Sequence, residues 1–196
     1  MQKWLYKQHA YRAFSMEDAY NYYRSDNMIQ NILPPVVDDN TRVLIVGSMP
    51  GVQSLEKQQY YGHPRNHFWP IISTITGHPV PESYEERLQL VRRHGIGLWD
   101  VIQSCERVGS LDSNIKKEVP NDFERLFTQF PKIEALFFNG TKAHDVFQKK
   151  LGFVLLSGKE YYKMPSTSPV PGRNIKTFEQ KVEIWRMLEK YIKRSD

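Results

Sequence analysis

The chain has 196 residues, of which 40% are hydrophobic and 25% charged. These values are typical of one soluble globular domain with a sizeable core. No apolar run approaches the roughly 20 residues that a membrane-spanning helix needs, and the polar N-terminus lacks the apolar core of a secretion signal. We therefore expect a cytoplasmic monomer with no membrane partner.

The formal net charge of +5 is unevenly distributed along the chain. Residues 141–196 carry 12 Lys and Arg against 6 Asp and Glu, whereas residues 1–140 carry 15 against 16. This excess suggests a surface that faces a polyanion, and a solvated amphipathic helix is an equally good explanation. The single cysteine, Cys105, excludes an internal disulfide and favours a buried thiol. The six histidines lack metal-ligand spacing, so we expect no metal and no cofactor.

The first 35 residues are rich in Tyr, Asn and Gln. They predict a short helix over 15–33, which Ser15 and Asp18 would cap and two prolines would end. We interpret residues 1–35 as a helical N-terminal extension and residues 36–196 as a single domain.

The rest of the chain alternates between apolar, β-branched runs and segments with helical periodicity. In chain order we expect a strand at 42–48, helices at 66–77 and 83–95, a strand at 96–102, a helix at 121–130, a strand at 133–139, a helix at 140–152, a strand at 153–157 and a last helix at 177–194. A capping box from Ser83 to Glu86 and a cap at Asn121 mark two helix starts. This order predicts an α/β fold, a three-layer α/β/α sandwich around a small, mostly parallel sheet of about four strands.

Ligands of such folds bind beyond the carboxyl ends of the strands. Met49–Gly51, Asp100, Asn139–Gly140 and the loop 164–174 each follow a predicted strand. We therefore expect them to meet at one edge of the sheet, around the same crevice as residues 60–66.

Three motifs stand out in these loops: GSMPG (47–51), YYGHPRNHFW (60–69) and STSP (166–169). None is a phosphate-binding P-loop. Together they resemble the uracil-DNA glycosylase superfamily over residues 42–190, and most closely its hypoxanthine-DNA (deoxyinosine) glycosylase branch. The resemblance implies hydrolysis of the bond between deoxyribose and a damaged base that is flipped out of double-stranded DNA.

The resemblance also implies roles for individual residues. Many branches have Asp or Asn at the third position of the glycine motif to handle the attacking water, but Met49 stands there and has no suitable polar atom. In the hypoxanthine branch this role is assigned to the asparagine that maps onto Asn66. That amide would hold the water or donate to the leaving base, and it also suits a helix N-cap. His63 either assists as a donor or packs in the turn, and Tyr61 either stacks on the base or is a core ring.

The remaining site residues follow from the same resemblance. Gly47, Ser48 and Met49 would line the base pocket. Asp100 would read the base by accepting from a purine N–H, or would only cap a loop. Asn139 would join them, although a turn asparagine is the simpler interpretation. The loop wedge that enters the duplex and grips phosphates would comprise Ser166, Ser168, Pro169, Val170 and Arg173, with Arg65 as a further phosphate contact; a proline-rich connector is the alternative. DSNI (112–115) would bring Ser113 or Asn114 near the DNA backbone, or form only a turn.

These inferences predict a monofunctional DNA glycosylase that acts on hypoxanthine first and uracil second, with damaged duplex DNA as its partner in the nucleoid. One alternative is a glycosylase of the same fold that prefers uracil or another lesion. A second is a non-catalytic nucleic-acid-binding module, which remains an alternative because Met49 stands in place of the polar residue of the glycine motif. A hydrolase of free nucleosides would not need the basic C-terminal region or the wedge.

Overall fold

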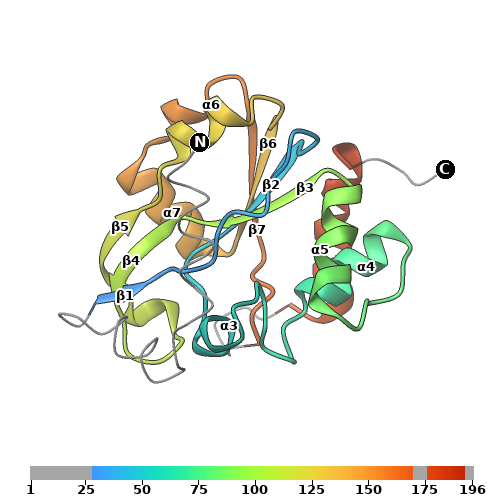
Figure 1. Ribbon diagram of the computed structural model, residues 1–196, viewed down its shortest axis with the longest axis horizontal. Coiled ribbons are helices and arrows are strands. Elements are labelled where there is room, and N and C mark those ends of the chain that lie inside the picture. Colours follow the sequence, from blue (N-terminus) through green and yellow to red (C-terminus); the bar gives the residue numbers. More distant parts are fainter. Residues whose placement is uncertain (1–27, 170–175, 193–196) are drawn as a thin grey trace.

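The computed structural model describes residues 28–169 and 176–192. At its centre lies a parallel sheet in the order β3–β2–β6–β7, seen edge-on near the middle of Figure 1. Its strands are β2 (Val43–Gly47), β3 (Ile96–Asp100), β6 (Ala135–Asn139) and β7 (Glu160–Met164). Within the described ranges, no helix combines the length and the apolar character needed to cross a membrane.

Helices cover both faces of this sheet (Figure 1). On one face lie α4 (Phe68–Thr76), α5 (Tyr84–Arg93) and α8 (Phe178–Trp185), and on the other lie α6 (Phe123–Gln129) and α7 (Thr141–Lys150). The short helix α3 (Val52–Lys57) follows directly after the carboxyl end of β2. The predicted three-layer α/β/α sandwich with four parallel strands is thus confirmed.

The residues of β2 show why both faces need a cover. Successive strand residues point to opposite faces. Accordingly, Val43 and Ile45 pack into the hydrophobic cluster of α4, α5 and α8, while Leu44 and Val46 pack into a second cluster with α6 and α7. All four side chains are fully buried, so β2 is fixed in register at the centre of the molecule.

A second sheet, which the sequence did not predict, flanks the first. Its antiparallel strands β1 (Met28–Gln30), β4 (Ile102–Glu106) and β5 (Lys116–Pro120) pair in the order β1–β4–β5 and lie on the left in Figure 1. The helix expected over 15–33 is therefore wrong at residues 28–33, where β1 pairs with β4 instead. Residues 1–27 lie outside the described ranges, and the domain boundary near residue 35 stays a prediction.

The fourth strand of the sheet lies later in the chain than the expected strand at 153–157. Residues Phe153–Leu156 form a 3₁₀ turn, and the strand of the sheet is β7. Val154 is 84% exposed, and the turn lies between Gly152 and Gly158, both with positive φ. Leu156 is buried and Phe153 and Leu155 pack against the core, so this apolar run packs as a tight turn and not as a strand.

Two helix ends also differ from the expectation. Asp122, not Asn121, caps α6, because its carboxylate accepts a hydrogen bond from Arg125 N at 3.0 Å. The last helix changes to a 3₁₀ helix at Arg186–Lys190. The capping box of Ser83 is confirmed, and so is the burial of Cys105.

Candidate active site

A cavity of about 660 Å³ lies beyond the carboxyl ends of the parallel strands, and we call it the strand-end cavity. Its volume falls within the roughly 300–1,000 Å³ typical of small-molecule sites. Most of the residues predicted for the site line it: Gly47, Ser48, Met49, Tyr61, His63, Asn66, Asp100, Asn139, Ser166, Ser168 and Pro169. Arg65 is exposed and does not line it, and Val170 and Arg173 lie outside the described residues.

Asp100, the last residue of β3, is 5% exposed. Asn31 Nδ2 donates a hydrogen bond to Asp100 Oδ2 at 3.1 Å and holds the carboxyl group in place. Burial raises the pKa of Asp100 to about 7, and the nearby charge of Asp112 adds to this effect, whereas the Asn31 hydrogen bond and the charge of Arg107 oppose it. A carboxyl group that titrates near neutrality in a cleft is a common mark of a functional site.

Tyr61 supplies a flat ring to the cavity. Phe68 covers the ring at 3.7 Å between centroids, with 22° between the planes. The backbone of Tyr61 has φ 55°, a left-handed conformation that is unusual for a bulky residue. Burial and the charge of Asp100 raise the pKa of Tyr61, so that its hydroxyl stays a donor. The strained backbone thus presents a supported ring at the cavity wall.

Tyr60 holds this turn from behind. Its side chain is 4% exposed, its hydroxyl donates to Pro34 O at 3.1 Å, and its carbonyl accepts from Trp69 Nε1 at 3.1 Å. The turn is therefore anchored both to the N-terminal segment and to α4.

Asn66 lies just before α4, where its Oδ1 accepts a hydrogen bond from Phe68 N at 2.9 Å. The N-cap of α4 is His67, which makes no side-chain cap hydrogen bond, so the predicted N-cap role of Asn66 is wrong; its bond to Phe68 N is a local turn bond at the start of the helix. Because the oxygen is engaged, the free group of the amide is Nδ2, for which the described residues provide no partner. In the same turn, His63 Nδ1 accepts from Arg65 N at 3.1 Å, which leaves Nε2 as the donor atom of a neutral ring.

The loop after β7 is tied to the cavity through Thr167, which is fully buried. Asn139 Oδ1 accepts from Thr167 N, and Asn139 Nδ2 donates to Thr167 Oγ1, both at 2.9 Å. His67 N, at the start of α4, donates to Thr167 O at 3.0 Å. Asn139 is thus bonded to this loop and does more than form a turn. Thr167, which lies between the predicted site residues Ser166 and Ser168, was not expected to belong to the site.

Residues 107–115 connect β4 to β5, and Ser110 and Asp112 of this loop line the strand-end cavity. Arg107 is 7% exposed, and its Nη2 donates to Pro50 O. Ser48 Oγ donates to Asp112 Oδ1 at 2.8 Å. The side chain of DSNI that reaches the site is thus Asp112, and not Ser113 or Asn114.

Asn31 and Asp112 were both missed as site residues. No local motif marks either one. Asn31 bonds to Asp100, and Asp112, which lines the cavity, bonds to Ser48, and both bonds join residues far apart in the sequence.

The site offers little for a metal ion. Among the described residues, no group of three or more His, Cys, Asp or Glu side chains is arranged to hold one.

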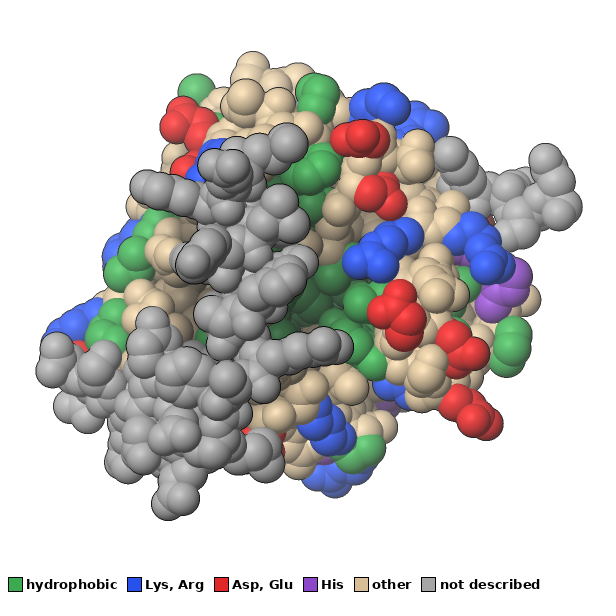
Figure 2. All heavy atoms as spheres, in the orientation of Figure 1, with side chains coloured by type: hydrophobic (Ala, Val, Ile, Leu, Met, Phe, Trp, Pro, Cys, Tyr) green, Lys and Arg blue, Asp and Glu red, His purple; other side chains and the backbone are tan. Residues whose placement is uncertain are grey.

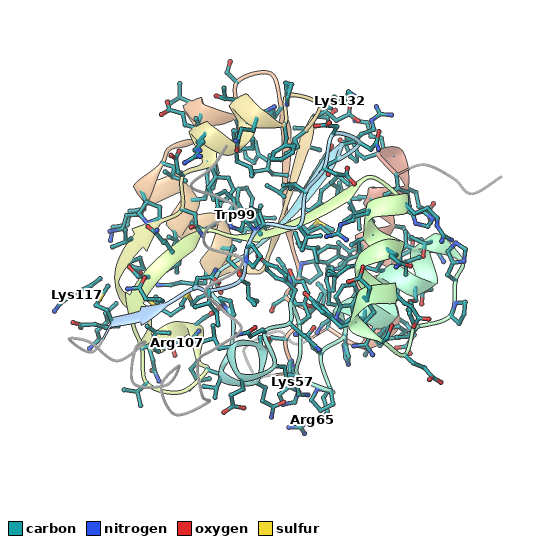
Figure 3. The ribbon with its side chains drawn as sticks, viewed as in Figure 1. Lys57, Arg65, Trp99, Arg107, Lys117 and Lys132 are labelled. Carbon is teal, nitrogen blue, oxygen red and sulfur yellow. The ribbon has the colours of Figure 1, made fainter. Side chains whose placement is uncertain are left out.

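Cationic side chains lie at the edge of the molecule near α3. Figure 3 shows Lys57 and Arg65 there, both directed outward. Lys57 Nζ donates to Gly62 O at 2.9 Å. Away from this edge, Figure 2 shows acidic and basic side chains interspersed around α5, so that this surface presents no single sign of charge.

Comparisons with known proteins agree with this geometry. The family model described as the uracil DNA glycosylase superfamily matches residues 34–189. A hypoxanthine DNA glycosylase of Methanosarcina acetivorans is 39% identical over 157 residues, which cover 80% of this chain and 97% of the relative. One of Methanosarcina barkeri is 44% identical over 111 residues, 56% of this chain and 70% of the relative.

Among solved structures, an NMR structure from Methanosarcina acetivorans, described as a candidate uracil DNA glycosylase, matches with a TM-score of 0.66 and 38% identity. It covers 80% of this chain, and 96% of its own length is matched. The shared sheet, the strand-end cavity and the match over 34–189 lead to one conclusion: the chain belongs to the uracil DNA glycosylase superfamily and is a DNA glycosylase, a hydrolase of N-glycosyl bonds.

Proposed function

We propose that the protein excises deaminated bases from duplex DNA, hypoxanthine first and uracil second, without cleaving the strand. The observation that carries the proposal is the placement of Tyr61, Asn66 and Asp100 around the strand-end cavity. A base turned out of the duplex needs a ring to stack on and polar groups that read its edge. The names of the two Methanosarcina relatives support the choice of hypoxanthine.

Asp100 accounts for the selection of deaminated bases. Deamination of adenine turns N1 from an acceptor into an N–H donor, and uracil carries a comparable N–H at N3. Above its pKa of about 7, Asp100 is ionised and only accepts hydrogen bonds, so in this form it favours both products and repels the N1 lone pair of adenine. The hydrogen bond from Asn31 to Oδ2 leaves Oδ1 for the base.

Asn66 acts as a donor in this proposal. Negative charge builds up on the departing base, and a fixed donor aimed at developing charge lowers the barrier. Phe68 N already donates to the amide oxygen, whereas Nδ2 has no partner among the described residues. This supports assistance to the leaving base over holding the water. The ring of His63 offers a second donor.

The lining of the cavity supports a reaction without strand cleavage. β-Elimination by a glycosylase requires an amine that forms a Schiff base with the sugar. None of the residues that line the strand-end cavity in the described ranges is a lysine, and Lys57 is bonded to Gly62 O at the outer edge. Water is therefore the nucleophile.

The test uses labelled duplexes that carry one hypoxanthine, uracil, xanthine or normal adenine. After incubation, half of each sample is treated with alkali, which breaks the strand at abasic sites. We expect breaks only after alkali, fastest for hypoxanthine, slower for uracil and absent for adenine. Intact strands throughout would favour the non-catalytic binding module, and breaks before alkali would contradict the monofunctional assignment. Hydrolysis of free deoxyinosine at a comparable rate would favour a nucleoside hydrolase.

A further inference from the structure

We propose that Asp112 is a further catalytic residue of this site, whose carboxylate orients and deprotonates the attacking water. The inference rests on the proposed glycosylase function and adds to it the group that replaces the polar residue missing at position 49. In this proposal Asp112 acts on the attacking water, whereas Asn66 and His63 act on the base.

The need for such a group follows from the residues already described. Met49 is 6% exposed and packs into the hydrophobic cluster on the α6 side of the sheet, and its thioether is a weak acceptor. Asn66 Oδ1 is occupied by Phe68 N. Neither side chain is therefore suited to draw a proton from water.

Three carboxylates line the strand-end cavity: Glu56, Asp100 and Asp112. Asp100 is held by Asn31 at the buried end of β3, where it faces the base in the proposal above. Glu56 and Asp112 are both exposed, but Glu56 makes no side-chain hydrogen bond or ion pair with the described residues that would hold it in place. Asp112 remains, and Ser48, the residue next to Met49, holds it at 2.8 Å.

The loop that carries Asp112 is fixed against the glycine motif at several points. Ser110 Oγ accepts a hydrogen bond from Val52 N at 3.0 Å, and Arg107 Nη2 donates to Pro50 O. Residues Asp112–Asn114 then form a 3₁₀ turn. These contacts come in addition to the bond from Ser48, so the carboxylate is positioned before any substrate arrives, as catalysis by orientation requires.

The surroundings of Asp112 also suit a base. Loss of hydration raises the pKa of Asp112, while the Ser48 hydrogen bond and the charges of Arg107 and Lys142 oppose the rise. A higher pKa strengthens a carboxylate as a proton acceptor. Ser48 donates to Oδ1 only, and Oδ2 is left for water.

The step balances as follows. The water oxygen bonds to C1′ of the deoxyribose while the C1′–N9 bond breaks and its electron pair leaves with the hypoxanthine. One water proton passes to Asp112 and from there to solvent, and the base anion takes up a proton from solvent. The products are an abasic sugar and neutral hypoxanthine, and no other reactant is needed.

The experiment measures single-turnover excision of hypoxanthine and, separately, the Kd for the same duplex. Asp112→Asn keeps the size of the side chain and an oxygen for Ser48, and it removes only the base. We expect its rate constant to fall by about 10²–10³-fold with Kd within about threefold. Asp39→Asn, which alters an exposed turn residue before β2, is the matched control and should keep the wild-type rate.

Ser48→Ala provides a second test, because it keeps the Asp112 carboxylate but removes the hydrogen bond that holds it. We expect a rate about tenfold lower, and this variant decides the matter if Asp112→Asn does not fold. Asp112→Asn within threefold of the wild-type rate, or a loss explained wholly by Kd, overturns the assignment. If the wild-type protein itself excises nothing, the proposed function has failed. If the wild-type protein is active and Asp112→Asn is equally active, only the role of Asp112 has failed.

Discussion

Gly47 and Asp100 lie opposite each other in the pairing of β2 with β3, and a Cβ on residue 47 would lie 2.2 Å from Asp100 Oδ1. No real Cβ contact is that short, so only glycine leaves the carboxylate its position. The other carboxylate oxygen, Oδ2, accepts a hydrogen bond from Asn31 Nδ2 at 3.1 Å, which a withdrawal of the side chain would break.

We therefore expect Gly47→Ala to lower the free energy of unfolding by about 1–3 kcal/mol, the usual cost of overpacking, and to impair excision at the same time. Urea denaturation and single-turnover rates measure the two effects. Gly51→Ala is the matched control for stability, because its added Cβ would lie 3.4 Å from the nearest atom, Ser110 Oγ. Equal stability of both variants would contradict the crowding at Asp100.

Asp100 should make stability depend on pH. Its pKa is raised from 3.8 to about 7 in the folded state, so the folded protein holds a proton that the unfolded chain has lost. Stability therefore falls as the pH rises from about 4 to 7 and is constant above that range, and three pKa units correspond to about 4 kcal/mol at most. Asp100→Asn removes this dependence.

We expect the Asp100→Asn protein to gain stability relative to the wild type between pH 5 and pH 8, as measured by urea denaturation at both pH values. A difference between the two proteins that is the same at pH 5 and pH 8 would show that the carboxyl group titrates normally. The same variant should lose its preference for hypoxanthine over adenine.

Asn66 accepts a hydrogen bond from Phe68 N and, in the proposed mechanism, donates to the leaving base, and different substitutions can separate the two contributions. Asn66→Asp keeps an oxygen for Phe68 N but lacks the Nδ2 donor, whereas Asn66→Ala loses both. We expect excision to fall by about 10²–10³-fold in each variant, while only Asn66→Ala loses stability, by about 1 kcal/mol. Thermal unfolding and single-turnover rates give the comparison. A wild-type rate in Asn66→Asp would show that the amide donor is not needed.

Arg65 should contribute to the salt dependence of DNA binding. Loss of one phosphate contact lowers the slope of log K against log salt by about 1, and we expect this for Arg65→Ala in fluorescence anisotropy between 50 and 200 mM salt, roughly the range in which such losses are seen. Lys132→Ala is the control, because Lys132 lies at the opposite end of the molecule from Arg65 (Figure 3). Equal slopes for both variants would show that Arg65 does not contact a phosphate of the DNA.

The central sheet was predictable because its strands are buried on both faces. β2, β3 and β6 are apolar almost throughout, and such runs can be read directly from the sequence. The capping box of Ser83 was predictable for a similar reason, since both partners lie within one turn. For these elements, patterns among residues close together in the sequence were thus sufficient to predict the structure.

The second sheet and β7 left no such pattern. β5 (KKEVP) and β7 (EYYKM) are largely exposed, and their pairing with neighbouring strands, not a hydrophobic period, makes them strands. In the site, the loops that carry Asn66 and Asp100 were predictable from motifs and strand ends. The contacts of Asn31 and Asp112 were not, because they join residues more than 60 positions apart.

Val101 is the single residue between β3 and β4, and thus the joint where one sheet ends and the other begins. Its N–H donates to Gly47 O, its carbonyl accepts from Asn121 N, and Ile102 N donates to Ser48 O. A shear between the two sheets would have to break the bonds to Gly47 O and Ser48 O and would displace the neighbouring Asp100. If Asp100 reads the base as proposed, mutations that loosen the smaller sheet should therefore weaken lesion discrimination from a distance.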